Sequence, residues 1–397
     1  MKVVDIVGAR PQFVKLAPIL KAIEQHNQHH SGRHIQEVLV HTGQHYDYVM
    51  SQVFFDEFKL KSPDYHLDVG SGSHAYQTGE VLKRIEDVLI KEKPDLVMVY
   101  GDTNATLSGA LAAAKLHIPV AHVEAGLRSF NRKMPEEVNR VLADHISTLL
   151  FCPTRTAVVN LQNEGLKRSI DGGELTPYPY SSPLKSTCSP DMPLVVNTGD
   201  VMYDSVLLYS GLAEKSSQIL HKLGLSARGY ALATVHRAEN TDDPLRLRSI
   251  FEGLQDVAAQ GLQVVVPLHP RTRKALTQSQ AHQALCSSLS IIDPVSYLDM
   301  IMLEKNARVI FTDSGGVQKE AFFFGVPCVT LRDETEWVET VQTRWNVLAG
   351  FDRDKIARAA QQARLGEEAA WPYGDGRTAE RIIEILALAF ETEFCCS

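Results

Sequence analysis

The sequence predicts an α/β protein built from two Rossmann-like domains that face a central cleft. Short apolar runs alternate with helix-like segments along most of the 397 residues. Glycine, acidic or basic residues follow directly after most of these apolar runs. Such alternation is typical of parallel sheets with helical crossovers, which bind ligands at the carboxyl ends of their strands. The length is sufficient for two or three domains of ordinary size.

The first domain is expected over residues 1–170, where strands and helices alternate regularly. A proline at the start of the first helix and an alanine-rich stretch after residue 103 favour helix at those places. The predicted strands are 2–7, 37–41, 96–100, 120–123 and 149–152, and the predicted helices are 11–25, 76–91, 103–117, 135–147 and 154–164.

Residues 171–193 interrupt the alternation with five prolines, two glycines and four serines. This composition indicates a linker or insert, either the hinge between the domains or an excursion beside it. The second domain is then expected over residues 194–376, followed by an amphipathic helix at 378–390. Its predicted strands are 195–197, 230–234, 264–268, 291–292, 309–312 and 328–331.

Composition excludes several classes of function. With 44% hydrophobic and 22% charged residues, the chain is typical of globular proteins. A net charge of −8 without a basic stretch argues against a nucleic-acid partner, and no apolar run is long enough for a membrane span. The first residues lack the pattern of a signal peptide, and six scattered cysteines form no metal or disulfide framework. We therefore expect a cytoplasmic protein without a bound metal.

Residues 308–331 form the most informative stretch, a strand, a glycine turn, a helix and a second strand. The turn contains Ser314, Gly315 and Gly316, whose backbone N–H groups at a helix N-terminus suit a phosphate group. Glu320 lies about one turn into the helix and can accept hydrogen bonds from the hydroxyl groups of a ribose. The alternative is a tight turn with a surface glutamate.

The first strand is followed by GARPQFVK, which lacks the dinucleotide-binding pattern of three glycines. Arg10 directly after the strand and Lys15 about one turn into the helix can both bind a diphosphate. The alternative for Lys15 is a solvated helix charge.

Three carboxylates follow neighbouring strands or begin a helix near them: Asp102, Glu124 and Glu136. Crowded carboxylates raise the pKa of at least one member, so that an acid and a base coexist near neutral pH. Alternatively, Asp102 caps the helix that follows it, and Glu136 complements the dipole of its helix.

Two histidines follow strands of the second domain. His236 can donate to a phosphate and stabilise a leaving diphosphate. His269 is a further candidate for binding the nucleotide, although it can equally be bonded to backbone.

The motifs that contain these residues resemble those of the non-hydrolysing UDP-N-acetylglucosamine 2-epimerases. The resemblance covers nearly the whole chain, through GARPQFVKLAP, HTGQH, KPDLVMVYGDTNATLSGALAA, IPVAHVEAGLRS, MPEEVNR, FCPT, TGDVMYDS, HRAENTDDP, TDSGGVQKEA, GVPCVTLRDETEW and PYGDG. It implies the GT-B fold, with the C-terminal helix, residues 377–397, packing back on the first domain. It also implies an isomerase that interconverts UDP-GlcNAc and UDP-ManNAc without a cofactor, commonly as a homodimer.

The implied mechanism is anti elimination of UDP to a 2-acetamidoglucal, followed by syn re-addition of UDP. By the resemblance, Asp102, Glu124 and Glu136 match the catalytic carboxylates and His236 matches the essential histidine. Two residues of the HTGQH motif, Gln44 and His45, match an allosteric site. The UDP-binding positions of the family are matched by Arg10, Lys15, Ser314, Gly315, Gly316 and Glu320.

Some sequence motifs depart from the common family pattern; for example, Trp337 stands where many members have an arginine. These variants resemble the branch that epimerises UDP-2,3-diacetamido-2,3-dideoxyglucuronate, whose extra carboxylate requires a basic partner such as Arg128, Arg132 or Arg237. A GT-B glycosyltransferase and a non-catalytic nucleotide-sugar sensor are the remaining alternatives. The sensor would not need the three carboxylates.

Overall fold

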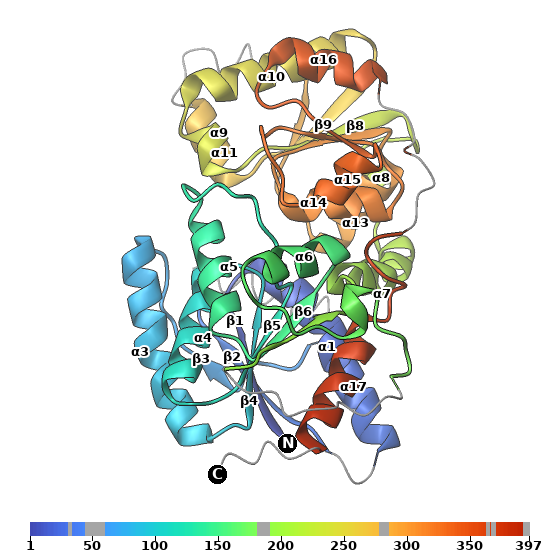
Figure 1. Cartoon of the computed structure of the whole chain (residues 1–397). Helices are drawn as coiled ribbons and strands as arrows, with labels where there is room; N and C mark the ends of the chain where they lie inside the picture. Colours follow the sequence, from blue (N-terminus) through green and yellow to red (C-terminus); the bar gives the residue numbers. More distant parts are fainter. Residues whose placement is uncertain are drawn as a thin grey trace. The chain divides into compact units, whose positions relative to one another are not determined.

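The structure is a computed structural model that describes residues 1–30, 34–43, 60–180, 191–277, 286–362, 366 and 371–391. The chain divides into two compact units. The first consists of Met1–Ser205 and Trp371–Ser397, and the second of Val206–Ala370. Each unit is an α/β domain with its own parallel sheet, so the predicted fold class is confirmed (Figure 1).

The first unit contains a seven-stranded sheet in the order β3-β2-β1-β4-β5-β6-β7. Every strand pair in it is parallel. Its elements are β1 (Lys2–Val7), α1 (Arg10–His29), β2 (Gln36–His41), β3 (Tyr65–His66), α3 (His74–Glu92), β4 (Leu96–Tyr100), α4 (Asn104–Lys115), β5 (Val120–Val123), α5 (Pro135–His145), β6 (Leu149–Cys152), α6 (Arg155–Asn163), the 3₁₀ turn Asp171–Gly173, β7 (Leu194–Asn197) and α17 (Thr378–Glu391).

The second unit contains a six-stranded parallel sheet in the order β10-β9-β8-β11-β12-β13. Helix α7 (Val201–Ser216) begins in the first unit and ends in the second. The other elements are α8 (Ile219–Lys222), β8 (Tyr230–Thr234), α9 (Ala238–Thr241), α10 (Pro244–Ala259), β9 (Gln263–Pro267), α11 (Pro270–Thr277), β10 (Ser290–Ile292), α13 (Tyr297–Asn306), β11 (Val309–Thr312), α14 (Gly315–Phe323), β12 (Cys328–Thr330), α15 (Val338–Gln342), β13 (Asn346–Leu348) and α16 (Arg353–Gln362).

Both sheets follow the Rossmann strand order, in which the chain starts near the middle and then reverses direction across the sheet. The reversal lies between β1 and β4 in the first unit and between β8 and β11 in the second. Loops diverge at such a point and leave a crevice at the carboxyl ends of the two strands. The topology therefore places one candidate site at the ends of β1 and β4 and another at the ends of β8 and β11.

The central strands are apolar along their length because helices cover both of their faces. All five residues of β4 and of β8 are buried. Polar side chains define where several helices begin: Thr103 accepts a hydrogen bond from the Thr106 N–H at the start of α4, and Asp243 caps α10 in the same way.

The predicted domain boundary differs from the structure. Residues 195–197 were assigned to the second domain, but β7 pairs with β6 and completes the first sheet. The segment 171–193 therefore connects two elements of the first unit and is not the hinge. Its described part is anchored there, since the Thr176 N–H donates to the Asn197 carbonyl. The chain passes to the second unit only within α7.

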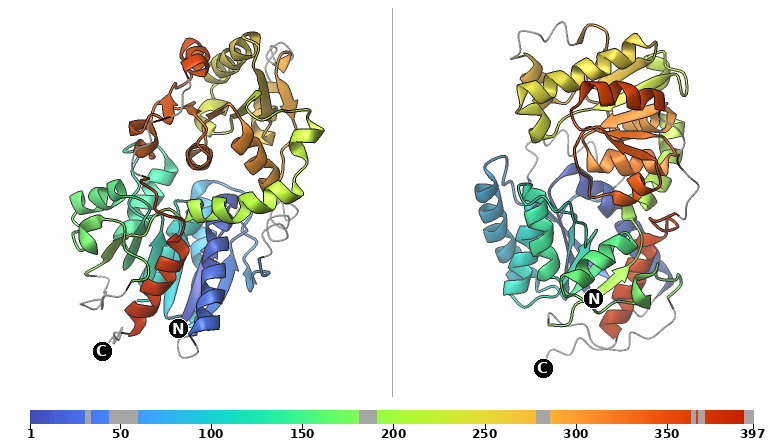
Figure 2. Two further views of the ribbon diagram at one scale, coloured as in Figure 1. Left: turned by 90° about the vertical axis from the view of Figure 1, so that its right-hand side faces the viewer. Right: turned by 45° about the horizontal axis from the view of Figure 1, so that its top comes forward.

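The final helix belongs to the first unit, where α17 packs against α1 (Figure 2). The return to the first unit occurs at Trp371, before the predicted end of the second domain at residue 376. Strands β3 and β13 were not predicted, because two and three residues carry too short a pattern to recognise. None of the helices in the described ranges is both long and apolar enough to cross a bilayer.

Candidate active site

The turn after β1 is joined to the turn after β4 by Gln12, a buried residue of α1. Its side-chain oxygen accepts hydrogen bonds from the backbone N–H groups of Gly8 and Ala9, at 2.8 and 3.0 Å. Its amide nitrogen donates to the Tyr100 carbonyl at 2.9 Å. One side chain thus fixes both loops at the topological reversal of the first sheet.

Lys15 and Glu124 meet beside this joint. The Lys15 Nζ lies 2.5 Å from Glu124 Oε1, and both residues are 7% exposed. They lie against Gly101, where an added Cβ would be 3.0 Å from Nζ and 3.4 Å from Oε1. The pair therefore places the Glu124 carboxylate next to the turn that carries Asp102.

Glu124 has a left-handed backbone, with φ of 72°. Such a conformation costs a residue with a side chain about 1–3 kcal/mol and is concentrated at functional sites. Two hydrogen bonds hold it, because the N–H groups of Glu124 and Ala125 both donate to the Phe151 carbonyl, at 3.1 and 3.0 Å.

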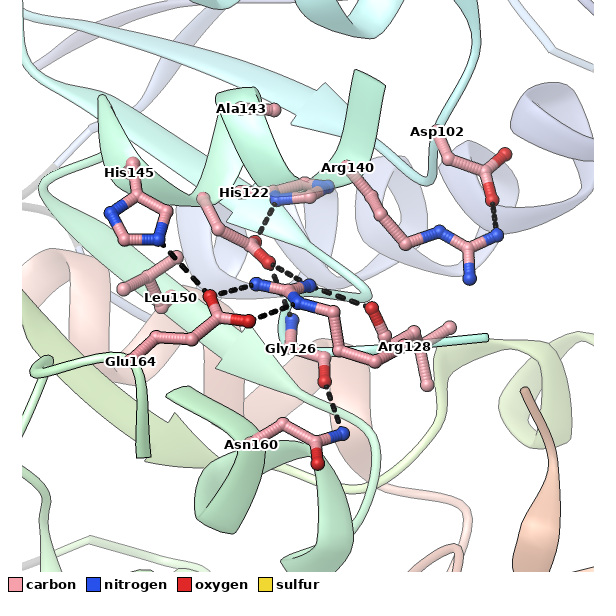
Figure 3. Close-up of polar contacts among 12 residues, drawn as sticks. Asp102, His122, Gly126, Arg128, Arg140, Ala143, His145, Leu150, Asn160 and Glu164 are labelled. Atoms are coloured by element: carbon pink, nitrogen blue, oxygen red, sulfur yellow. Dashed lines mark hydrogen bonds and ion pairs between the residues drawn. The ribbon is translucent and has the colours of Figure 1, made fainter. Parts of the chain in front are cut away.

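Asp102 follows the Gly101 turn and is ion-paired with α5. The Arg140 Nη2 lies 2.5 Å from Asp102 Oδ2 (Figure 3). The Asn139 side chain donates to the Asp102 carbonyl at 3.0 Å. Arg140 is buried, whereas the Asp102 side chain remains 28% exposed. Asp102 is therefore oriented by a buried cation and still reaches solvent. The alternative role was that of a helix cap, but the cap of α4 is the next residue, Thr103.

Glu136 and Glu137 in the first turn of α5 have different environments. Glu137 is buried and accepts hydrogen bonds from the backbone N–H groups of Ser129 and Phe130, both at 2.9 Å. Glu136 is partly exposed and lies four residues before Arg140 on the same helix face. Glu137 is thus a structural group, and Glu136 is the member of the pair that can reach a ligand.

A buried network lies behind these turns (Figure 3). The Asp144 carboxylate accepts from Arg128 at 2.7 Å and from the Gly126 N–H at 3.1 Å, and it contacts His122 at 2.7 Å. Burial acts to raise the pKa of Asp144, but His122 and Arg128 outweigh burial and hold this pKa below its usual value. Arg128 also binds Glu164 through two 2.7 Å contacts. It is therefore committed to two internal carboxylates, which removes it from the predicted partners of a substrate carboxylate.

In the second unit, Asp313 organises the turn that carries His236. The buried Asp313 carboxylate accepts hydrogen bonds at 3.0 Å from the N–H groups of His236 and Arg237 and from the Asn240 side chain. The His236 ring nitrogen Nδ1 lies 3.4 Å from the same carboxylate. The ends of β8 and β11 are thereby locked together, just as Gln12 locks β1 and β4.

His269 lies beside His236, with ring centroids 5.7 Å apart. Its Nδ1 accepts a hydrogen bond from the Arg271 N–H at 3.2 Å, the bond to backbone that was one of the two predictions for it. The residue is nonetheless exposed at the end of β9.

Ser314 caps α14 by accepting a hydrogen bond from the Val317 N–H at 3.5 Å. Gly315 packs closely against two side chains, because an added Cβ would lie 2.6 Å from Glu336 Oε1 and 3.1 Å from Trp337 Nε1, so Glu336 would have to shift to admit it. At Gly316 the nearest atom would be 3.8 Å away, so no contact within the described residues demands glycine there.

Trp337 is 3% exposed and packs under the Ser314–Gly315 turn, with the Lys319 ammonium 3.9 Å from the centre of its ring. Glu320 is 5% exposed and accepts a hydrogen bond from the Tyr297 hydroxyl at 2.9 Å. The alternative of a surface glutamate is therefore wrong.

Thus the structure brings Lys15, Asp102 and Glu124 together in the first unit, and His236, His269 and the turn of Ser314 in the second. The residues that sequence analysis missed are partners of these groups, chiefly Gln12, Asn139, Arg140 and Asp313. The helical spacing of Asn139 and Arg140 from Glu136 was the available signal. The Arg10 side chain, Gln44 and His45 lie outside the part of the chain that the structure describes. Among the described residues, no cluster of histidine, cysteine and acidic side chains is arranged to hold a metal ion.

Comparison with known proteins identifies relatives over nearly the full length. A UDP-N-acetylglucosamine 2-epimerase from Methanocaldococcus jannaschii, solved in complex with UDP-GlcNAc and UDP, is 43% identical with a TM-score of 0.83. That comparison covers 97% of this chain and 99% of the other. The UDP-2,3-diacetamido-2,3-dideoxy-D-glucuronate 2-epimerase of Pseudomonas aeruginosa is 48% identical over 98% of this chain and 99% of its own.

A UDP-N-acetylglucosamine 2-epimerase homolog of Methanococcus maripaludis is 50% identical over 97% of this chain and 99% of its own. The two parallel sheets of this chain, together with its likeness to the solved Methanocaldococcus jannaschii structure, confirm the expected two-domain α/β fold of the GT-B type. The family model described as UDP-N-acetylglucosamine 2-epimerase matches residues 27–387. The chain therefore belongs to the UDP-N-acetylglucosamine 2-epimerase family, whose members are isomerases.

Proposed function

We propose that this protein is a non-hydrolysing 2-epimerase that interconverts UDP-GlcNAc and UDP-ManNAc. The observation that carries the proposal is the pairing of Asp102 with Arg140 and of Glu124 with Lys15 at adjacent strand ends of the first sheet. Each of these two carboxylates has a buried cation beside it, which orients the carboxylate at the end of its strand. Family membership supplies the substrate class.

The reaction begins with removal of the C2 proton of the sugar by a carboxylate. The C2–H electrons form the C1–C2 double bond, and the C1–O bond breaks as UDP leaves. Because C2 is not next to a carbonyl group, the departure of UDP is what makes proton removal possible. The product of this step is a 2-acetamidoglucal.

The return step places a proton on the opposite face of C2, while the UDP oxygen adds back to C1. Epimerisation by this route requires proton carriers on both faces. Asp102, Glu124 and Glu136 are the groups we assign to these transfers. The net reaction consumes nothing, and the proton that leaves exchanges with solvent.

We assign UDP binding to the second unit. The N–H groups at the start of α14, with the Ser314 cap, suit phosphate oxygens, and His236 can donate to the leaving diphosphate. Glu320 is assigned to the ribose, and His269 to the nucleotide. In the first unit we assign Arg10 and Lys15 to the diphosphate. Retaining UDP near the glucal is essential, since free diffusion would turn epimerisation into hydrolysis.

A second candidate substrate is UDP-2,3-diacetamido-2,3-dideoxyglucuronate. It is favoured by the 48% identity to the Pseudomonas enzyme, compared with 43% to the Methanocaldococcus enzyme and 31% to that of Escherichia coli. With Arg128 committed to Asp144 and Glu164, Arg132 and Arg237 are the remaining candidates for its extra carboxylate.

The decisive experiment offers each nucleotide sugar alone to the protein in deuterated water. Formation of the epimer with deuterium at C2 supports the proposal, and the faster substrate is the assigned one. Release of free sugar and UDP would indicate a hydrolysing enzyme. Two intact, unlabelled substrates after long incubation would refute the epimerase assignment.

We further propose a cytoplasmic homodimer. Val138 and Leu142 lie one turn apart on α5 and are 41% and 47% exposed, an apolar strip that suits contact with a second copy. Light scattering during gel filtration should give twice the 44.0 kDa mass of the chain, and Leu142→Glu should lower it. A monomeric mass for the unaltered chain at micromolar concentration would refute the dimer.

A further inference from the structure

His122 connects the two turns that carry the candidate carboxylates of the first unit. It lies in the internal strand β5, flanked by Val99 of β4 and Leu150 of β6, and is fully buried. Its Nε2 lies 2.7 Å from the Gly101 carbonyl, directly before Asp102. Its Nδ1 lies 2.7 Å from Asp144 Oδ1 (Figure 3).

Asp144 extends this connection to the other turn. Its second oxygen, Oδ2, accepts a hydrogen bond from the N–H of Gly126, two residues after Glu124. Gly126 packs closely against α6 and tolerates no side chain, since a Cβ there would lie 2.4 Å from the Ala157 carbonyl oxygen, and its φ is 80°. One imidazole ring and one carboxylate thus join the Asp102 turn to the Glu124 turn.

The hydrogen-bond partners decide how many protons the ring carries. A backbone carbonyl only accepts, so Nε2 must carry a hydrogen. The Asp144 carboxylate already accepts from Arg128 and Gly126 and is ionised, so Nδ1 must carry a hydrogen as well. A neutral imidazole has one N–H and cannot satisfy both contacts.

The surrounding charges are consistent with an additional positive charge. Asp144 from α5 and Glu164 after α6 supply two carboxylates, against the single guanidinium of Arg128. Among the described residues, two further titratable groups adjoin this network: His145, which contacts Glu164 at 3.0 Å from its exposed edge, and Cys152 of β6. Burial raises the pKa of the Cys152 thiol, so the thiol stays neutral. A cationic His122 makes the buried group electrically neutral.

We propose that His122 is a positioning residue: a doubly protonated imidazolium that holds the Asp102 turn and the Glu124 turn at a fixed separation. This inference rests on the proposed function, because those turns carry the carboxylates assigned to proton transfer. His122 does not itself carry a proton to the sugar, since it is fully buried and both ring nitrogens are engaged.

The protonation state is tested without any substrate. Nitrogen-15 labelled histidine in the full-length protein gives separate signals for the two ring nitrogens, and His122→Gln assigns them by loss of signal. Both nitrogens should carry a hydrogen in the unaltered protein, as their two hydrogen-bond partners require. In Asp144→Asn the amide can donate to Nδ1, so His122 should carry one hydrogen, on Nε2. An unprotonated ring nitrogen in the unaltered protein would overturn the proposal.

The positioning role is tested by kinetics on folded protein. His122→Gln can keep one of the two bonds and not both, so kcat should fall by about 10²-fold, while KM stays within about threefold. The control is His145→Gln, which removes a contact to Glu164 at the outer edge of the same network and touches neither turn. It should leave kcat unchanged.

Equal kcat for His122→Gln and the unaltered protein, with both folded by circular dichroism, would overturn the positioning role. A rise in KM with unchanged kcat would do so too. If the unaltered protein epimerises neither nucleotide sugar, the proposed function fails, whereas the nitrogen-15 result still reports on His122.

Discussion

The Lys15 ammonium lies 2.5 Å from the Glu124 carboxylate, and both residues are almost completely buried. Lys15 comes from the first turns of α1 and Glu124 follows the end of β5, so the pair joins helix α1 to the end of that strand. Removing the cation of such a pair leaves an uncompensated buried charge, which is strongly destabilising. The pair therefore gives Lys15 a role within the first unit, in addition to the proposed role in binding UDP.

Lys15→Met should leave Glu124 buried without a cation. Removing one partner of a buried ion pair typically destabilises a protein by about 3–5 kcal/mol. We expect a lower unfolding temperature and a large loss of turnover. Lys21→Met, on an exposed position of the same helix, is the control and should change neither. Equal stability of the Lys15→Met and Lys21→Met variants would contradict the importance of the pair.

Asp102→Asn should reduce kcat by roughly 10²–10⁴-fold with a modest change in KM, as expected for loss of an acid or base. Asparagine keeps the shape of the side chain and can still accept a hydrogen bond from Arg140. Steady-state kinetics and deuterium incorporation at C2 measure the loss. Near-normal turnover would show that Asp102 transfers no proton.

Glu136 and Glu137 provide a matched pair of adjacent carboxylates. Glu136→Gln should reduce turnover by roughly 10²–10⁴-fold and leave the unfolding temperature unchanged. Glu137→Gln should mainly lower the unfolding temperature, because the buried carboxylate binds the Ser129 and Phe130 amides and lies 3.2 Å from Arg140. If instead only Glu137→Gln lost turnover with full stability, the two assignments would have to be exchanged.

The strand ends were predictable from the sequence, whereas the partners of the side chains at those ends were not. Asp102 and Glu124 directly follow apolar runs, and parallel strands deliver such residues to one edge of a sheet. The pairing of Asp102 with Arg140 joins residues 38 positions apart. This pairing depends on how α5 packs against α4, and no local sequence pattern indicates that packing. Whether residues 194–197 belonged to the first or the second sheet was equally undecidable, since strand pairing is a long-range contact.

Glu320→Ala should weaken the binding of UDP by about 1–3 kcal/mol, the range for a lost hydrogen bond to a charged group. The control is Tyr297→Phe, which removes a hydrogen bond to Glu320 and keeps the carboxylate. It should weaken binding less than Glu320→Ala does. Titration calorimetry with UDP measures both. Unchanged affinity in Glu320→Ala would count against a contact with the ribose.

Asp204 of α7 should make stability depend on pH. The side chain accepts a hydrogen bond from the Ala379 N–H at 2.7 Å, at the start of α17. Burial raises the pKa of Asp204 to about 7, and hydrogen bonds from Ala379 and Thr378 offset only part of this effect. The folded state therefore binds the proton more tightly than the unfolded state. This contribution to stability is complete below about pH 4 and is lost as the pH rises through about 7.

Asp204→Asn removes this titration, so the variant should gain stability relative to the unaltered protein as the pH rises from about 4 to about 7. The gain should be roughly 2–4 kcal/mol, measured by urea unfolding across that range. Asp375→Asn is a control of opposite sign, because the hydrogen bond from Arg381 outweighs burial and lowers the pKa of Asp375. The unaltered protein should therefore lose stability relative to the Asp375→Asn variant as the pH falls. Parallel pH dependence of the two variants would contradict both assignments, since a buried carboxyl without a cation and a carboxylate paired with arginine must titrate in opposite directions.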